Sequence, residues 1–132
     1  MPHILVVEDD KMNATLFEVI LRRRGGFTVT VTEDPLQVID LARKKSIDLV
    51  IMDVSLSNSF LNGKAVDGLE ISRVLKQDPV TKHIPILLAT AHSMQGVREK
   101  FLAESKADDY ISKPITDQKQ LIERVKHYLP PA

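Results

Sequence analysis

Three short and nearly uninterrupted apolar runs, at residues 4–7, 47–52 and 84–89, constrain this chain most. Runs of this kind are typical of parallel strands that are covered by helices on both faces. Residues 27–31, where valines alternate with threonines, and the short segment 110–112 have the pattern of edge strands. The sequence therefore predicts a five-stranded parallel sheet with its second and fifth strands outermost.

Between these runs the apolar residues change to helical spacing. The stripes include residues 16–20, 36–42, 71–75, 94–101 and 121–129. Asp34 followed by Pro35 is typical of a helix start, and Thr116 is expected to cap the last helix. Strands that alternate with five helices predict an α/β fold, a doubly wound sheet built from βαβ units.

Composition mainly excludes functions. The 132 residues argue for one domain, and the absence of cysteine excludes a disulfide scaffold and a thiolate zinc site. Lysine and arginine number 18 and balance 18 acidic residues, so the chain lacks the basic surplus of nucleic-acid and membrane-surface proteins. No apolar stretch approaches the ~20 residues of a membrane span. We expect a single cytoplasmic domain over residues 1–132, without an output domain.

Polar residues gather where the predicted strands end, which is where open parallel sheets carry their function. These residues are Glu8, Asp9 and Asp10 after the first strand, Asp53 after the third, Thr90 after the fourth and Lys113 after the fifth. Asp53 is the most specific of them, because no predicted helix begins there for it to cap. Three acids at one edge favour a hard divalent cation such as Mg²⁺. A carboxylate nucleophile, a metal, an amine and a hydroxyl together predict phosphoryl transfer to Asp53.

Simpler structural roles remain open for some of these residues. Either Asp9 or Asp10 is suited to cap the first helix, and Thr90 to cap the fourth. Lys113 is suited to a salt bridge with the acids. One helix cap does not explain three acids, however, so the set as a whole favours a site.

In order along the chain, five motifs resemble those of the bacterial response-regulator receiver domain, of the stand-alone chemotaxis type. The motifs are ILVVEDD at 4–10, LVIMD at 49–53, DGLE at 67–70, TA at 90–91 and ADDYISKP at 107–114. The resemblance covers nearly the whole chain. It implies a flavodoxin-like sheet with strand order 2-1-3-4-5.

The resemblance also implies a phosphoacceptor site in a two-component system or phosphorelay. Asp53 would receive the phosphoryl group from a sensor histidine kinase or a histidine phosphotransfer protein. The ligands of Mg²⁺, or of Mn²⁺ in its place, would be Glu8, Asp9, Asp53 and the backbone carbonyl of Ser55.

Further roles follow from the same resemblance. Lys113 and Thr90 would contact the phosphoryl group, and Thr90 and Tyr110 would move together as a switch. Ser55 and His92 flank the site and are hypothesised to tune dephosphorylation. The fourth helix, fifth strand and fifth helix would form the output face, which binds a downstream protein or a second copy in a weak dimer.

Two departures from the family pattern stand out. Ser57 replaces a common proline, and residues 57–66 form a longer loop in which Phe60 and Leu61 are hypothesised to anchor a partner. Lys106 replaces a common glycine, for which we expect only a local turn adjustment.

Other functions are less consistent with these residues. We expect no enzyme activity beyond self-catalysed phosphotransfer and autodephosphorylation. An aspartate-nucleophile phosphatase would need a second acid where Ser55 stands, and a flavodoxin-like electron carrier would need a phosphate-binding loop where three acids stand. The main alternative is a degenerate receiver that binds proteins independently of phosphorylation.

Overall fold

The computed structural model describes residues 2–56, 60–61, 63–91, 95–113 and 115–129. Its strands are β1 (His3–Val7), β2 (Thr28–Thr32), β3 (Leu49–Asp53), β4 (Phe60–Leu61), β5 (Lys64–Ala65), β6 (Ile86–Thr90) and β7 (Asp109–Ser112). Its helices are α1 (Lys11–Arg23), α2 (Pro35–Arg43), α3 (Gly68–Gln77), α4 (Gln95–Ser105) and α5 (Gln118–Tyr128). In the described part of the chain, no helix is long and apolar enough to cross a membrane.

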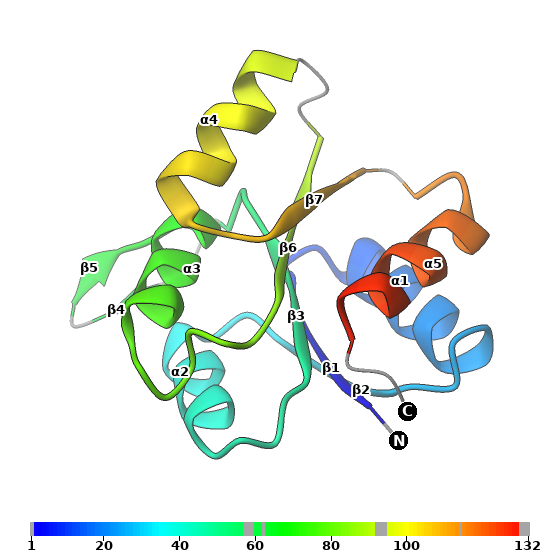
Figure 1. Ribbon diagram of the computed structural model, residues 1–132, viewed down its shortest axis with the longest axis horizontal. Coiled ribbons are helices and arrows are strands. Elements are labelled where there is room, and N and C mark those ends of the chain that lie inside the picture. Colours follow the sequence, from blue (N-terminus) through cyan, green and yellow to red (C-terminus); the bar gives the residue numbers. More distant parts are fainter. Residues whose placement is uncertain (1, 57–59, 62, 92–94, 114, 130–132) are drawn as a thin grey trace.

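The main sheet has the predicted topology. Its five strands are parallel and run in the order β2-β1-β3-β6-β7, so the second and fifth predicted strands lie at the edges. Helices α1 and α5 cover one face, and α2, α3 and α4 lie on the other (Figure 1). Each face of the sheet has its own hydrophobic core, and alternate residues of β1 point into the two cores. Ile4 and Val6 pack with α1, and Leu5 and Val7 pack with α2 and α3.

Aspartates begin four of the helices. Asp10 caps α1 by accepting hydrogen bonds from the backbone of Met12 and Asn13, which settles the role of one of the three acids after β1. Asp34 and Asp67 cap α2 and α3. The prediction that Thr116 caps the last helix is wrong: Asp117 accepts from the backbone N of Gln120, so the helix begins one residue later.

The loop after β3 contains a short structure that the sequence did not predict. Strands β4 and β5 form a two-residue antiparallel hairpin that pairs Phe60 with Ala65 and Leu61 with Lys64. Gly63 in its turn has φ +78°, a conformation that favours glycine. Phe60 is 57% exposed, which agrees with the hypothesis that it is available to a partner.

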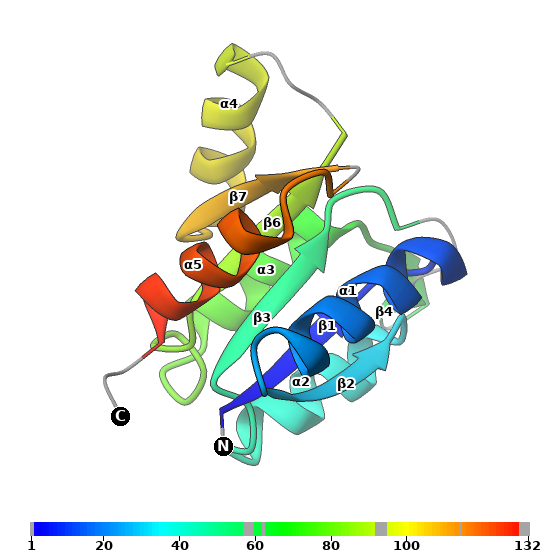
Figure 2. The same cartoon turned by 90° about the vertical axis from the view of Figure 1, so that its right-hand side faces the viewer.

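Helix α4 differs from the other helices in how it is held. Ser105 is its only buried residue among the side chains that the structure describes. Two hydrogen bonds tie its C-terminal end to α3, from Ser72 Oγ to the carbonyl of Ser105 and from Arg73 to that of Glu104. Its N-terminal end stands away from the sheet (Figure 2).

Candidate functional site

The register of the sheet brings the predicted site residues to one edge. Parallel pairing sets Val7 beside Met52, Asp53 beside Ala89 and Thr90 beside Ser112. The residues at the carboxyl ends of β1, β3, β6 and β7 therefore converge. Glu8, Asp53 and Lys113 lie together at this edge, and Thr90 ends the neighbouring strand β6.

Three carboxylates meet at this edge. One carboxylate oxygen each from Glu8, Asp9 and Asp53 lies within 4.8 Å of the others. Glu8 is 4% exposed and Asp53 2% exposed, whereas Asp9 is half-buried. Because buried carboxylates repel one another and lose hydration, this cluster requires positive charge.

Lys113 supplies part of that charge. Its Nζ lies 2.8 Å from Asp53 Oδ1 and 3.4 Å from Glu8 Oε1. Its backbone N donates to the carbonyl of Thr90 at 2.9 Å, which fixes the loop after β7 to the end of β6. Burial alone would lower the pKa of the Lys113 amine, but the hydrogen bond and the charges of Asp53 and Glu8 raise it, so the amine stays protonated.

One amine does not fully compensate the three acids. Burial, followed by the negative charge of Asp53, raises the pKa of Glu8 to about 7 in spite of Lys113. Oxygen ligands that are close together and short of positive charge are the donor set that Mg²⁺ prefers. Glu8, Asp9 and Asp53 therefore fit a hard divalent cation.

The backbone around Asp53 is fixed on several sides. The Asp53 carboxylate accepts a hydrogen bond from the backbone N of Ser55 at 3.1 Å, and Val54 N donates to the carbonyl of Ala89 at 3.1 Å. Gly68 approaches so closely that a Cβ there would lie 1.9 Å from the carbonyl oxygen of Asp53. The glycine of the DGLE motif is thus required by the close packing of α3 against the strand end that carries Asp53.

Thr90 and Tyr110 lie farther along the same edge. Thr90 is 2% exposed at the end of β6, and Tyr110 is half-buried on β7. Arg98 from α4 donates from Nη1 to the Tyr110 hydroxyl at 2.9 Å, and its guanidinium carbon lies 4.7 Å from the centre of the ring. Arg124 from α5 donates to the Tyr110 carbonyl at 2.7 Å.

Sequence reasoning did not predict that two arginines enclose Tyr110. A charged residue on a predicted helix carries no local signal of a contact with another element. His92 and Pro114, by contrast, lie outside the described residues, as do residues 57–59 and 62 of the loop.

The fold and this edge define a phosphoryl-signalling domain, and comparison with known proteins identifies the family. Residues 4–126 match the response regulator receiver domain. The chain belongs to this family. That membership supports phosphorylation-based signalling and does not favour the alternative of a binding module independent of phosphorylation.

Individual relatives, found by sequence or by structure, support this family assignment. The chain is 36% identical over 126 residues to the polar-differentiation response regulator DivK of Brucella anthropi, a match that covers 96% of this chain and 94% of DivK. It is 29% identical, with TM-score 0.80 and 96% coverage of both chains, to the receiver domain of a sensor histidine kinase from Pseudomonas aeruginosa PAO1 whose active-site cleft holds a magnesium ion. The chemotaxis protein CheY4 of Vibrio cholerae shares the fold, with TM-score 0.81, 20% identity and coverage of 98% of this chain and 99% of that one.

Proposed function

We propose that Asp53 receives a phosphoryl group from the phosphohistidine of a sensor histidine kinase or a histidine phosphotransfer protein. The observation that carries this proposal is the convergence of one amine and two further carboxylates on a buried aspartate. Helix capping does not explain that arrangement, because Asp10 already caps α1. The location, beyond the carboxyl ends of parallel strands, is the usual site of function in such sheets.

The hydrogen bonds of Asp53 indicate which of its oxygens reacts. Oδ1 accepts from Lys113 Nζ at 2.8 Å and from the backbone N of Ser55 at 3.1 Å. We take Oδ2, which makes neither of these two hydrogen bonds, as the nucleophile. It forms a bond to phosphorus while the bond from phosphorus to the donor's imidazole nitrogen breaks, and the electron pair of that bond leaves with the imidazole.

The acid cluster is the proposed place of the metal ion. Glu8, Asp9, Asp53 and the backbone carbonyl of Ser55 would hold Mg²⁺, or Mn²⁺ in its place. When bound, the ion supplies positive charge between these oxygens and those of the incoming phosphoryl group.

The remaining site residues respond to the new group. Lys113 transfers its hydrogen bonds from the carboxylates to a phosphoryl oxygen, and the Thr90 hydroxyl donates to another. Tyr110 changes position with Thr90, as in other two-state switches driven by a local charge. Ser55, whose backbone N donates to the Asp53 carboxylate, tunes hydrolysis of the acyl phosphate, a role that we also propose for His92.

The signal leaves through the face formed by α4, β7 and α5. The phosphorylated chain binds a downstream protein there or passes the phosphoryl group onward. Phe60 and Leu61 form the first strand after β3 in the sequence, and the Phe60 side chain is exposed. These two features support their proposed role as an anchor for a kinase or target.

Incubation with acetyl phosphate tests the phosphoacceptor directly. We expect one Mg²⁺-dependent phosphoryl adduct by intact-mass spectrometry, and none on Asp53→Asn. Asp10→Asn is the matched control, since it changes an acid at the same edge that serves as a helix cap. An adduct that persists on Asp53→Asn, or that forms equally in a chelator, would contradict the proposal.

A further inference from the structure

A small cavity lies on the output face between β7 and α5, next to α4. Its volume is about 220 Å³, below the ~300–1,000 Å³ of pockets for drug-sized ligands. Most of its lining is polar: Arg98 from α4, Tyr110 and Ser112 from β7, and Gln120 and Arg124 from α5. A cavity of this size and polarity suits one polar side chain of another protein better than a cofactor.

The charges that line this cavity are unevenly compensated. Arg124 forms an ion pair with Asp109 at 3.6 Å. Asp117, which also lines the cavity, caps α5 through the backbone of Gln120. Arg98 has no carboxylate within ion-pair distance in the part of the chain that the structure describes, so the lining carries excess positive charge.

The guanidinium of Arg98 is also incompletely hydrogen-bonded. Nη1 donates to the Tyr110 hydroxyl, but the buried Nε has no hydrogen-bond partner within the described residues. A buried N–H without an acceptor has lost its hydration without compensation and is therefore unfavourable. A carboxylate is a stronger acceptor than a phenol and binds two N–H groups of a guanidinium at once. Arg98 therefore gains most from an acidic partner that this chain does not itself provide.

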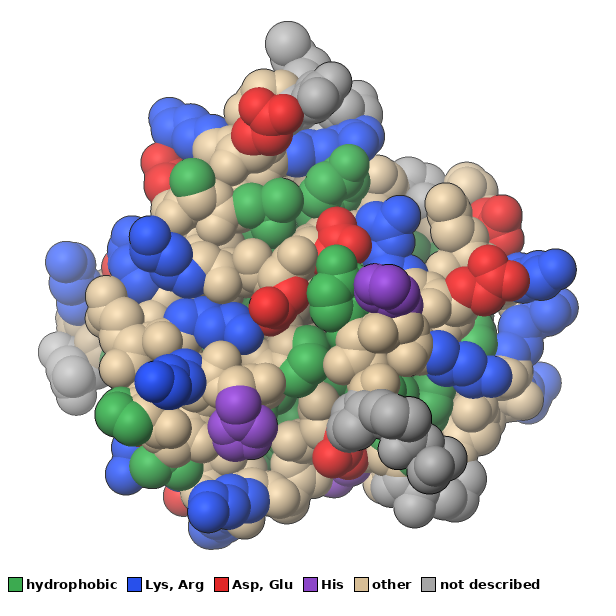
Figure 3. Space-filling view, viewed as in Figure 1, with side chains coloured by type: hydrophobic (Ala, Val, Ile, Leu, Met, Phe, Trp, Pro, Cys, Tyr) green, Lys and Arg blue, Asp and Glu red, His purple; other side chains and the backbone are tan. Residues whose placement is uncertain are grey.

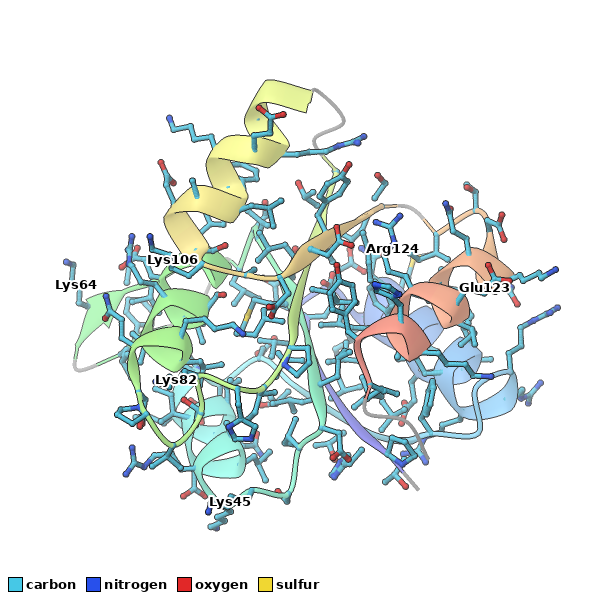
Figure 4. The ribbon with its side chains drawn as sticks, in the orientation of Figure 1. Lys45, Lys64, Lys82, Lys106, Glu123 and Arg124 are labelled. Carbon is cyan, nitrogen blue, oxygen red and sulfur yellow. The ribbon has the colours of Figure 1, made fainter. Side chains whose placement is uncertain are left out.

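The attachment of α4 allows Arg98 to change partners. The helix is tied to α3 at Glu104 and Ser105, whereas its N-terminal end stands clear of the sheet in both views (Figure 1, Figure 2). Arg124 lies on the side of α5 near β7, while Glu123 points away from it (Figure 4). Arg98 thus belongs to the wall that α4 contributes to the cavity, and Arg124 belongs to the wall that α5 contributes.

We propose that this cavity binds an acidic side chain of a partner protein, whose carboxylate is taken by Arg98 with Arg124 as the second, shared charge. The proposal deepens the proposed function, because it rests on this face being where a partner docks. When Arg98 turns to the carboxylate, it releases the Tyr110 hydroxyl. By reciprocity, any change that moves Tyr110 also changes the affinity for the acidic partner.

A titration followed by NMR tests this with a defined probe. The peptide acetyl-Ala-Glu-Glu-Ala-amide is added to the unphosphorylated, ¹⁵N-labelled chain without Mg²⁺, beside a counterpart with glutamines. We expect saturable shifts of the Arg98 Nε–Hε signal and of the Ser112 and Gln120 amides. Affinity for the glutamine peptide should be lower by about tenfold or more, as expected when a charged acceptor becomes neutral.

Three variants make the test specific. Arg98→Lys keeps the charge but removes the planar edge, and we expect about fivefold weaker binding. Lys100→Ala, on the exposed side of the same helix, should stay within about twofold. Tyr110→Phe removes the competing hydroxyl and should strengthen binding about threefold, and thermal unfolding checks that each variant folds.

Several results would overturn the inference. These are equal binding of both peptides, shifts that map outside the cavity, an Arg98→Lys variant that binds as wild type does, and self-association of the chain through this face. Labelling of Asp53 by acetyl phosphate is measured separately and needs no peptide. Failure of the cavity proposal is therefore distinguishable from failure of the phosphoacceptor proposal.

Discussion

The edge that carries Asp53 and the helix α4 are held in opposite ways. Asp53 and Glu8 are 2% and 4% exposed, at the ends of the central strands β3 and β1, and Lys113 bonds to both. Helix α4 fully buries only Ser105 among its described side chains, and it is held by the partly buried Phe101 and Leu102 and by polar contacts at its C-terminal end. Under the proposed function this contrast is useful, because a phosphoacceptor needs a fixed position and a switching element needs a second position of similar energy.

The two regions also differ in electrostatics. At the Asp53 edge, negative charge is concentrated and only partly compensated. On the face seen in Figure 3, by contrast, acidic and basic side chains are interspersed, in keeping with a formal net charge of zero. Substitutions at the Asp53 edge should therefore change stability strongly, and substitutions around α4 should act mainly on local motion.

Removing the amine at the Asp53 edge should have the largest effect. Lys113→Met leaves Glu8 and Asp53 buried without their cation, and we expect a loss of about 4 kcal/mol in the free energy of unfolding, measured with urea. Lys44→Ala is the control, because its pair with Asp40 is exposed on both sides and should contribute less than about 0.5 kcal/mol. Equal losses in the two variants would refute the contrast between the regions.

The pH dependence of stability should reveal Glu8. Its pKa is raised to about 7 in the folded chain and lies near 4.5 when unfolded, so between these values the folded state holds a proton that the unfolded state has released. The contribution of Glu8 to the free energy of unfolding is complete below about pH 4.5 and is lost as the pH rises through about 7. Above that pH the contribution no longer changes. The loss is about 3 kcal/mol.

Unfolding in a chelator at about pH 5 and about pH 8 measures most of that loss, because the unfolded carboxyl is already largely ionised at about pH 5. Glu8→Gln should lack the corresponding slope, because glutamine does not titrate. Added Mg²⁺ should reduce the slope in the wild type by favouring ionised Glu8. Parallel pH profiles for wild type and Glu8→Gln would show that Glu8 titrates normally.

Arg98 should matter for motion more than for stability. Arg98→Ala removes the hydrogen bond and the cation–π contact with Tyr110, which together contribute about 1 kcal/mol at a partly exposed site. Amide hydrogen exchange should become faster in residues 97–102 and remain unchanged in β3. Uniform acceleration across the sheet would mean that α4 and the sheet unfold as one unit.

The sequence predicted the sheet and the acid edge because both follow from short-range patterns. Buried strands appear as apolar runs, and a charged residue directly after such a run, as at Asp53, has a position fixed by the strand. The cap at Asp117 in place of Thr116 was a choice between adjacent residues that helix propensities alone do not decide. The hairpin at Phe60 and the arginines around Tyr110 depend on contacts between separate segments, which no local pattern encodes.

The smallest predicted effect concerns the C-terminal end of α4, where Glu104 and Ser105 attach the helix to α3 and which we call its hinge. Lys106 follows the helix with φ +61° and donates its backbone N to the carbonyl of Leu102, so the turn adjustment expected there takes the form of a left-handed residue (Figure 4). Lys106→Gly should relieve roughly 1 kcal/mol of strain and lose part of it to the greater freedom of glycine when unfolded, for a net gain of about 0.5 kcal/mol. Lys45, at φ 60° after α2, is the matched control. If both glycine variants are stabilised alike but only Lys106→Gly speeds exchange in residues 97–102, the turn at Lys106 also restrains α4, and the hinge extends beyond Ser105.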